Sequence, residues 1–154
     1  MRLVDTVYRE GQRLGVADRR EGLSMRLFWL ALCLAPVTVL VPILEVGPTH
    51  VFNPAWPGHA RLHEVWQLIT NSALALFAFW LAWRRGLERI ACGIGLIQCL
   101  GFLAALALSP LYGGTMRHAD GTELAVGGIN VAVIVIGLST IGLLGLLRGA
   151  FKHR

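Results

Sequence analysis

THVFNPAWPGHARLHEVWQ, residues 49–67, is a polar segment that lies between two strongly apolar runs. The segment holds three histidines, two prolines, two tryptophans, an arginine and a glutamate. Each flanking run is long enough to cross a bilayer, so we expect this segment where hydrocarbon meets water. Unpaired polar groups are costly at such a boundary, so their concentration here indicates a role.

The composition of the chain is that of an integral membrane protein. Of its 154 residues 55% are hydrophobic and only 15% are charged, and the mean hydropathy is +0.62. Four apolar segments carry the excess, at residues 27–46, 64–83, 90–108 and 124–147, and each is close to the ~20 residues that span a bilayer as a helix. Helices satisfy their own backbone hydrogen bonds in lipid. The sequence therefore predicts an all-α, four-helix membrane bundle.

The basic residues predict how this bundle is oriented. Twelve of the 14 Lys and Arg residues precede the first span, follow the second or follow the fourth, and only Arg61 and Arg117 fall on the other side. Because cytoplasmic segments are rich in Lys and Arg, we expect both termini in the cytoplasm of a bacterial cell and residues 49–67 outside its inner membrane. The chain then divides into a basic N-terminal segment (1–26), a four-span domain (27–147) and a basic tail (148–154).

The net charge of +5 follows from this topology. It favours anionic lipid headgroups as partners and gives no reason to expect nucleic acid. Apolar residues recur at helical spacing among the arginines before residue 20, which suits a short helix on the inner membrane surface. No cleavable signal is evident, and an alternative reading takes Met25 as the start of the chain. Three cysteines fall in or near the spans and indicate apolar packing rather than disulfides: Cys33, Cys92 and Cys99.

Several features predict how the spans are arranged. Pro36 and Pro42 each remove a helical hydrogen bond from the first span and invite a kink. The short turn at residues 84–89 makes the second and third spans antiparallel neighbours. A faint duplication would make the bundle two tandem hairpins, because three residues of the first half recur 66 to 68 positions later. These pairs are Cys33 and Cys99, Pro42 and Pro110, and His50 and His118.

A polar stripe is the sharpest pattern in the chain. Pro57 can open a helix, since its missing N–H would be unpaired there. If the second helix starts at that point, four polar residues follow at steps of four and share one face, namely His59, His63, Gln67 and Asn71. At 1.5 Å per residue the stripe would run about 18 Å towards the bilayer midplane.

Other spans carry polar residues that we expect to turn inward, because facing lipid would cost their hydration. Glu45, Gln98 and Asn130 are the main ones, and together they predict a polar pocket that opens outward. The outer loops would bring six residues to its mouth: His50, Asn53, Trp56, His118, Asp120 and Glu123. Simpler roles are open for several of these groups. The amides could hydrogen-bond helix to helix, Arg61 could bind lipid phosphate and the tryptophans could anchor at the interface.

The pattern T-H-x-F-N-P-x-W-P-x-H-A-R-x-H, here residues 49–63, resembles the signature loop of an uncharacterised family of small four-span membrane proteins found mainly in bacteria and fungi. The resemblance covers this loop and the start of the second helix, and more weakly the four-span layout. It implies an integral membrane protein with the motif on an outer loop. It implies no activity and no catalytic residue.

Three functions are compatible with these patterns. An accessory or assembly subunit would dock its polar loop and glycine-rich helices on a larger membrane complex or on another copy. An enzyme or binder of an amphiphilic lipid, isoprenoid or quinone could move a proton with His63 and either Glu64 or Glu45. The ligand-binding candidates are then His59, Gln67, Asn71, Asn53, Trp56, Arg61, Gln98 and Asn130.

A metal site is the third reading. Histidines four residues apart on a helix can grip one copper or zinc ion, and outer-loop histidines could complete its shell. The candidate ligands are His50, His59, His63 and His118. The sequence names no cofactor, and it contains no common nucleotide-binding or nucleophile motif.

Overall fold

Four long helices make up the protein, and each is long and apolar enough to cross a membrane, as predicted. The structure is a computed structural model that describes residues 21–118 and 120–152. The first span is Glu21–Glu45, followed by α3 (Gly58–Arg85), α4 (Glu88–Tyr112) and α5 (Val131–Lys152). The helix predicted on the membrane surface before residue 20 lies outside the described residues, and residues 21–26 already belong to the first span.

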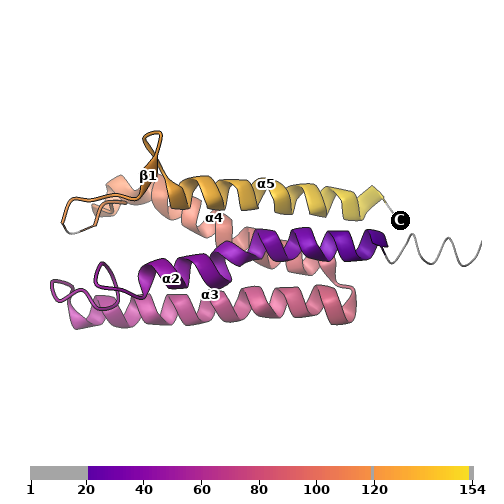
Figure 1. Cartoon of the computed structure of the whole chain (residues 1–154), viewed down its shortest axis with the longest axis horizontal. Helices are drawn as coiled ribbons and strands as arrows, with labels where there is room; N and C mark the ends of the chain where they lie inside the picture. The colour runs from indigo at the N-terminus through magenta and orange to yellow at the C-terminus, as the bar shows by residue number, and fades with distance from the viewer. Residues whose placement is uncertain (1–20, 119, 153–154) are drawn as a thin grey trace, which may run out of the picture.

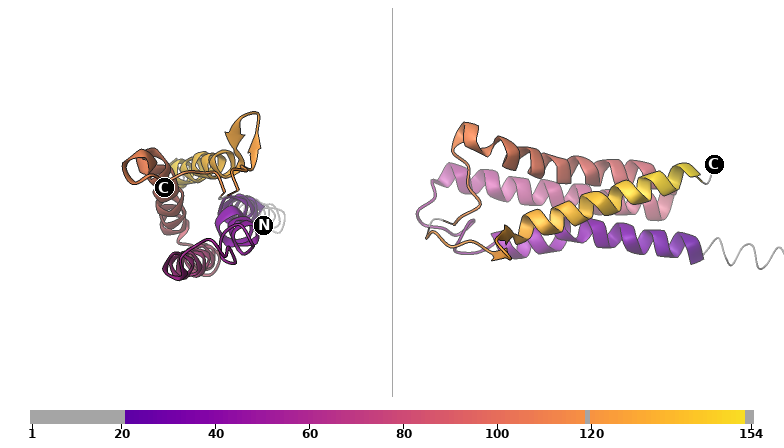
Figure 2. Two further views of the ribbon diagram at one scale, coloured as in Figure 1. Left: turned by 90° about the vertical axis from the view of Figure 1, so that its left-hand side faces the viewer. Right: turned by 90° about the horizontal axis from the view of Figure 1, so that it is seen from above.

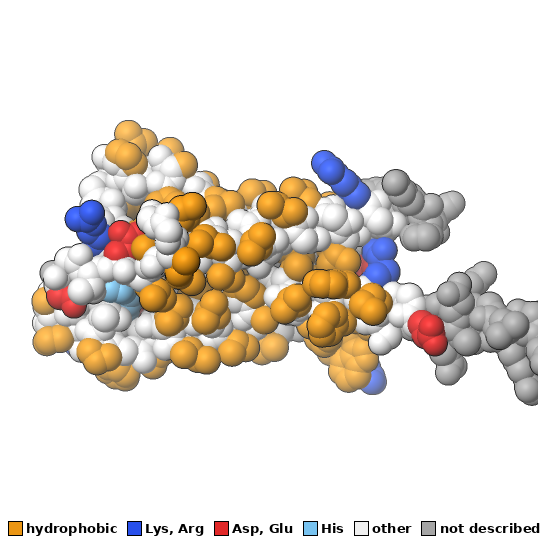
Figure 3. Space-filling model, turned by 45° about the horizontal axis from the view of Figure 1, so that its top comes forward, with side chains coloured by type: hydrophobic (Ala, Val, Ile, Leu, Met, Phe, Trp, Pro, Cys, Tyr) orange, Lys and Arg blue, Asp and Glu red, His pale blue; other side chains and the backbone are white. Residues whose placement is uncertain are grey.

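The long connections lie at one end of the bundle, which we call the loop end (Figure 1). The first span begins and α5 ends at the opposite end, the terminal end, where the α3–α4 turn also lies (Figures 1 and 2). Hydrophobic side chains cover the middle of the molecule, and the charged side chains gather towards the two ends (Figure 3). This distribution suits a protein whose middle contacts hydrocarbon and whose ends contact water and headgroups.

The prolines distort the first span as predicted. Helical residues 21–35 are followed by a π-helical turn, η1 (Pro36–Leu40), and by the short α2 (Val41–Glu45). The backbone N–H of Val41 bonds to the carbonyl of Pro36, five residues back rather than four. Pro42 has no N–H to donate and its ring crowds the preceding turn, so a wider turn accommodates it. The span changes direction there (Figure 1).

The turn between α3 and α4 is as short as predicted. Gly86 ends α3 in the left-handed conformation, with φ of 66°, and its N–H bonds to the carbonyl of Ala82. Leu87 donates to the carbonyl of Leu81 at 3.1 Å, and α4 begins at Glu88. This double closure is the usual way for a glycine to end a helix. It makes α3 and α4 antiparallel neighbours.

The start of the fourth span differs from the prediction. Residues 124–130, taken from composition as helix, form a β-hairpin that pairs β1 (Ala125–Val126) with β2 (Ile129–Asn130). Gly127 and Gly128 make its two-residue turn with φ of 60° and 79°. Two consecutive positive φ angles are the requirement of a tight hairpin turn, and glycine meets it without strain. The helix then begins seven residues later than predicted, at Val131.

The helices meet over a core made largely of small and aliphatic side chains. All three cysteines are free and buried in it, as predicted. Gly95 and Gly142 mark the closest approaches, because an added methyl group at Gly142 would lie 2.5 Å from Sγ of Cys33. Small residues allow helices in lipid to approach closely and gain van der Waals contact.

Arg26 fastens three helices at the terminal end. Its Nε donates to Oε2 of Glu88 at 2.7 Å, and its Nη2 donates to the carbonyl of Leu146 at 3.1 Å. The first span is thereby joined to the start of α4 and to α5. Both charged side chains are largely shielded, with 24% and 18% of their surfaces exposed, so the pair is less screened than a surface ion pair.

Candidate functional site

The polar stripe forms on α3 as predicted, but most of it faces outward. Pro57 directly precedes the helix, so the histidines fall on its first two turns. His59, His63 and Gln67 are exposed, while Asn71 is half-buried. The Nε2 atoms of the two histidines lie 3.1 Å apart, a hydrogen bond that neutral imidazoles can make. The first three stripe residues therefore point away from the interior of the bundle.

A groove runs along this exposed face. It measures about 300 Å³ and is lined by five residues of α3. One wall is the indole of Trp66, whose ring lies 5.7 Å from that of His63. The lining residues are His63, Trp66, Gln67, Thr70 and Asn71. Thr70 was not among the sequence candidates, although its position seven residues after His63 puts it on the same face.

The innermost residue of the stripe, Asn71, takes part in a hydrogen bond between α3 and α4. Nε2 of Gln98 on α4 donates to the backbone carbonyl of Asn71 at 2.7 Å and lies 3.4 Å from its Oδ1. Oε1 of Gln98 is buried and has no partner among the described residues. Of the two roles open for these amides, the structure favours the hydrogen bond between α3 and α4.

A second polar group, which we call the outer cluster, joins the two long connections at the loop end. It consists of Glu45, His50 and His118. Nδ1 of His50 lies 2.9 Å from Oε2 of Glu45 and 3.0 Å from Oγ1 of Thr49. The ring of His50 lies 5.1 Å from that of His118 and 5.3 Å from that of Trp56, edge to face in both cases. Residues 68 positions apart are thereby brought into contact.

The backbone of the first connection explains how this contact arises. The carbonyl of Glu45 accepts hydrogen bonds from the N–H groups of Gly47 and Val51, at 2.9 and 3.2 Å. The chain therefore folds back over the end of α2, which carries His50 onto the carboxylate of Glu45. Glu64 lies close enough for its charge to act on Glu45. Of the proposed catalytic residues, the structure thus brings Glu45 and Glu64 near each other, whereas His63 contacts His59 and Trp66.

Burial lowers the pKa of His50 below its ordinary value, and the neighbouring imidazole of His118 lowers it further. The neutral imidazole is therefore favoured at neutral pH, and its Nδ1 makes a hydrogen bond with the carboxyl group of Glu45. Nδ1 of His118 is buried and lacks a hydrogen-bond partner among the described residues.

Other predicted ligand-binding residues serve the fold. Asn53 is buried: its Nδ2 donates to the carbonyl of Thr49 at 3.1 Å, and its Oδ1 accepts from the N–H of Ala55 at 2.9 Å. Asn130 precedes α5 rather than lying within it, and its Oδ1 accepts from the N–H of Ala132, as an N-terminal cap does. Arg61 is half-buried on the first turn of α3.

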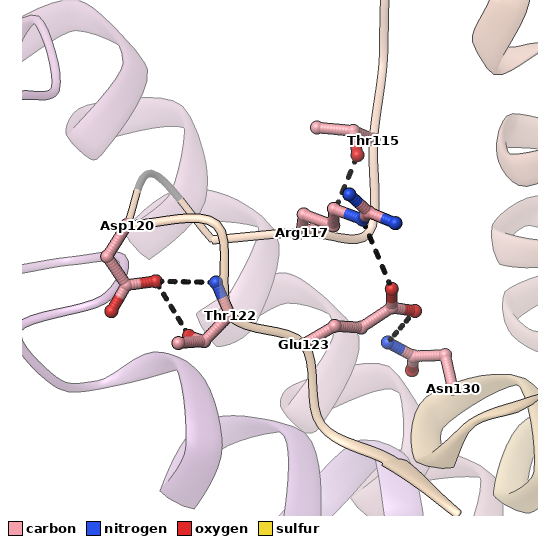
Figure 4. A network of polar contacts seen from close by, with 6 residues as sticks. All are labelled: Thr115, Arg117, Asp120, Thr122, Glu123 and Asn130. Carbon is pink, nitrogen blue, oxygen red and sulfur yellow. Dashed lines mark hydrogen bonds and ion pairs between the residues drawn. The ribbon is translucent and has the colours of Figure 1, made fainter. Parts of the chain in front are cut away.

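The second connection has a polar network of its own (Figure 4). Oδ1 of Asp120 accepts from both the N–H and the hydroxyl of Thr122, at 2.9 and 2.6 Å, and these bonds lower the pKa of Asp120. Glu123 accepts from Nδ2 of Asn130 at 3.2 Å and lies 3.8 Å from Nε of Arg117. The network shapes the chain on both sides of His118.

The four candidate metal ligands form two pairs, His50 with His118 and His59 with His63. In the part of the chain that the structure describes, no three His, Cys, Asp or Glu side chains are arranged to hold a metal ion. The geometry of the described residues therefore gives the metal reading no support.

Comparison of the chain with protein-family models, with curated proteins and with solved structures finds no match. The resemblance of the outer loop to a family of four-span proteins stays a prediction.

Proposed function

We propose that this is a multi-pass protein of the bacterial cytoplasmic membrane, with both termini in the cytoplasm, that serves as an accessory or assembly subunit of a membrane complex. The orientation is supported by the basic residues, because Arg84, Arg85 and Arg148 belong to the terminal end. At the loop end, Arg61 and Arg117 are the basic residues of the described chain. The proposal that the protein joins a membrane complex is supported by the exposed polar residues on α3.

The observation that carries the proposal is the exposure of the polar stripe on a membrane-spanning helix. Gln67 lies nine residues into α3, about 14 Å along it at 1.5 Å per residue, and falls within the predicted second span at residues 64–83. A polar side chain facing hydrocarbon at such depth loses its hydration without gaining a partner. Another transmembrane segment with polar groups at the same depth would supply that partner.

A photoreactive amino acid at Gln67 tests this proposal. Irradiated in living cells, Gln67→benzoylphenylalanine should give a discrete adduct heavier than the chain itself, because a protein segment covers the stripe. Leu138 provides the matched control, since it is 64% exposed and lies at a comparable depth on α5. The same probe at Leu138 should give little protein adduct. Protein adducts at neither position would contradict the proposal.

A second candidate function is binding of an amphiphile, and the groove favours it. The groove combines the flat indole of Trp66 with polar groups of His63, Gln67, Thr70 and Asn71, which suits a lipid-like molecule with a polar head. Mass spectrometry of the protein purified in mild detergent should then find one amphiphile in stoichiometric amount. Thr70→Leu, which removes a polar wall, should deplete it.

A further inference from the structure

Near the end of α3, Trp83 and Arg84 form an exposed cation–π contact at the terminal end. The guanidinium carbon of Arg84 lies 5.3 Å from the centre of the indole ring of Trp83, within the range of such an interaction. Trp83 is 58% exposed, and Trp80, one turn before Arg84, is 44% exposed. We call the surface formed by Trp80, Trp83 and Arg84 the terminal patch.

The terminal patch is attached to the core of the bundle. Phe79 packs against the core, and its ring stacks on that of Trp83 with the centroids 6.5 Å apart and the planes inclined by 25°. The two residues are four apart, which places them on one face of the helix. Phe79 thereby restrains Trp83, which in turn restrains the guanidinium of Arg84. A side chain that is held in advance loses less conformational entropy when it binds a ligand.

The charge of Arg84 is not neutralised by a carboxylate within the described residues. The ion pairs there join other residues, and Glu88, at the start of α4, is bonded to Arg26 at 2.7 Å. Arg85 is exposed as well and makes no ion pair in the described part of the chain. The N–H donors of Arg84 are therefore available to an anion from outside the chain.

The depth of the terminal patch decides which anion it meets. Arg84 directly follows the predicted second span, residues 64–83, so its guanidinium lies where the hydrocarbon ends and the headgroups begin. Lipid phosphates lie at that level, and tryptophan is enriched there. A guanidinium binds phosphate through two parallel hydrogen bonds, while an indole ring contacts the neighbouring acyl chain. A soluble acidic protein would first have to displace the headgroups to reach the tryptophans.

We propose that the terminal patch binds one anionic phospholipid, with Arg84 on the phosphate and Trp80 and Trp83 against the upper part of the acyl chains. In the proposed orientation this lipid belongs to the cytoplasmic leaflet. The site goes beyond the proposed function, because it requires no partner protein. A lipid bound there fixes the depth of α3 in the membrane.

Titration of phospholipid onto the delipidated protein, followed by native mass spectrometry, tests the site. Phosphatidylglycerol should bind more tightly than zwitterionic phosphatidylcholine, and Arg84→Gln should weaken its binding about fivefold. Trp83→Leu keeps the charge but removes the ring that holds it, and should weaken binding about twofold or more. Arg85→Gln is the matched control, because it removes the same charge one residue away. It should change binding by less than about twofold, since an exposed charge without a fixed geometry contributes little.

Equal losses for Arg84→Gln and Arg85→Gln would overturn the site, because the lipid would then respond to charge alone. Equal binding of the two phospholipids would also overturn it, as would displacement of the lipid by inorganic phosphate. The two arginine variants should melt alike in detergent, because both side chains are exposed. A difference in lipid binding between them therefore cannot come from unfolding. Failure of the site leaves the proposed function standing, since the probe at Gln67 tests another part of α3.

Discussion

His50 is the residue on which the two long connections depend. It bonds to Glu45 through Nδ1 and contacts His118 and Trp56 through its ring. The sequence placed His50 and His118 at the mouth of a polar pocket, but it could not pair them, because irregular connections have no period from which contacts follow. The stripe on α3 could be predicted residue by residue, since helical spacing alone decides which side chains share a face. Which way that face points depends on packing, and it was not predictable from α3.

The protein should become less stable as the pH falls, because of His50. Its pKa is lower in the folded protein than in the unfolded chain, where histidine titrates near about 6.5. The unfolded state therefore binds a proton more readily than the folded state. The stabilisation is complete above about pH 6.5 and is lost as the pH falls from there through the lower pKa of the folded state. Between about pH 7.5 and 5, the melting temperature in detergent should drop about 2–4 °C more in the wild type than in His50→Asn.

Asparagine is chosen because its amide can replace the Nδ1–H donor to Glu45 without titrating. Asp120 does not interfere, because its lowered pKa gives stabilisation that is lost only below about pH 4. Identical slopes for the wild type and His50→Asn would contradict the role of His50.

At the scale of elements, the spans and their order could be predicted, but not all of their boundaries, because the first span begins six residues earlier than predicted and the fourth helix begins seven residues later. Hydropathy and length located all four helices, and the prolines located the distortion of the first. The start of the fourth was wrong because residues 124–130 are apolar enough to read as helix. In the structure the Gly127–Gly128 pair within this run makes a hairpin turn, so the helix cannot begin before it.

Close packing of α5 on the first span predicts different costs for two neighbouring glycines. Gly142→Ala should lower the free energy of unfolding by about 1–3 kcal/mol, because the new methyl would press on Sγ of buried Cys33. Gly145→Ala, less than one turn further along α5, meets nothing within 4 Å and should be neutral or stabilising by up to ~1 kcal/mol. Melting in detergent compares the two variants. Equal effects would show that the helices do not approach at Gly142.

At the scale of the whole molecule, the proposed orientation predicts which ends of the bundle a reagent can reach. Thr115→Cys places a thiol on the exposed second connection, and Leu87→Cys places one on the α3–α4 turn, while the native cysteines are buried. In intact spheroplasts a membrane-impermeant maleimide should label position 115 and spare position 87. Permeabilisation should expose both. The reverse pattern would invert the proposed topology.

Different contacts hold the helices together at the two ends of the bundle. At the terminal end Arg26 joins the first span to α4 and α5, and the short turn after Gly86 holds α3 to α4. At the loop end the described residues of the two connections meet where the imidazole ring of His50 contacts that of His118. We therefore expect a large change of shape to separate the helices at the loop end, while Arg26 keeps them together at the terminal end. The contact between His50 and His118 would have to break first.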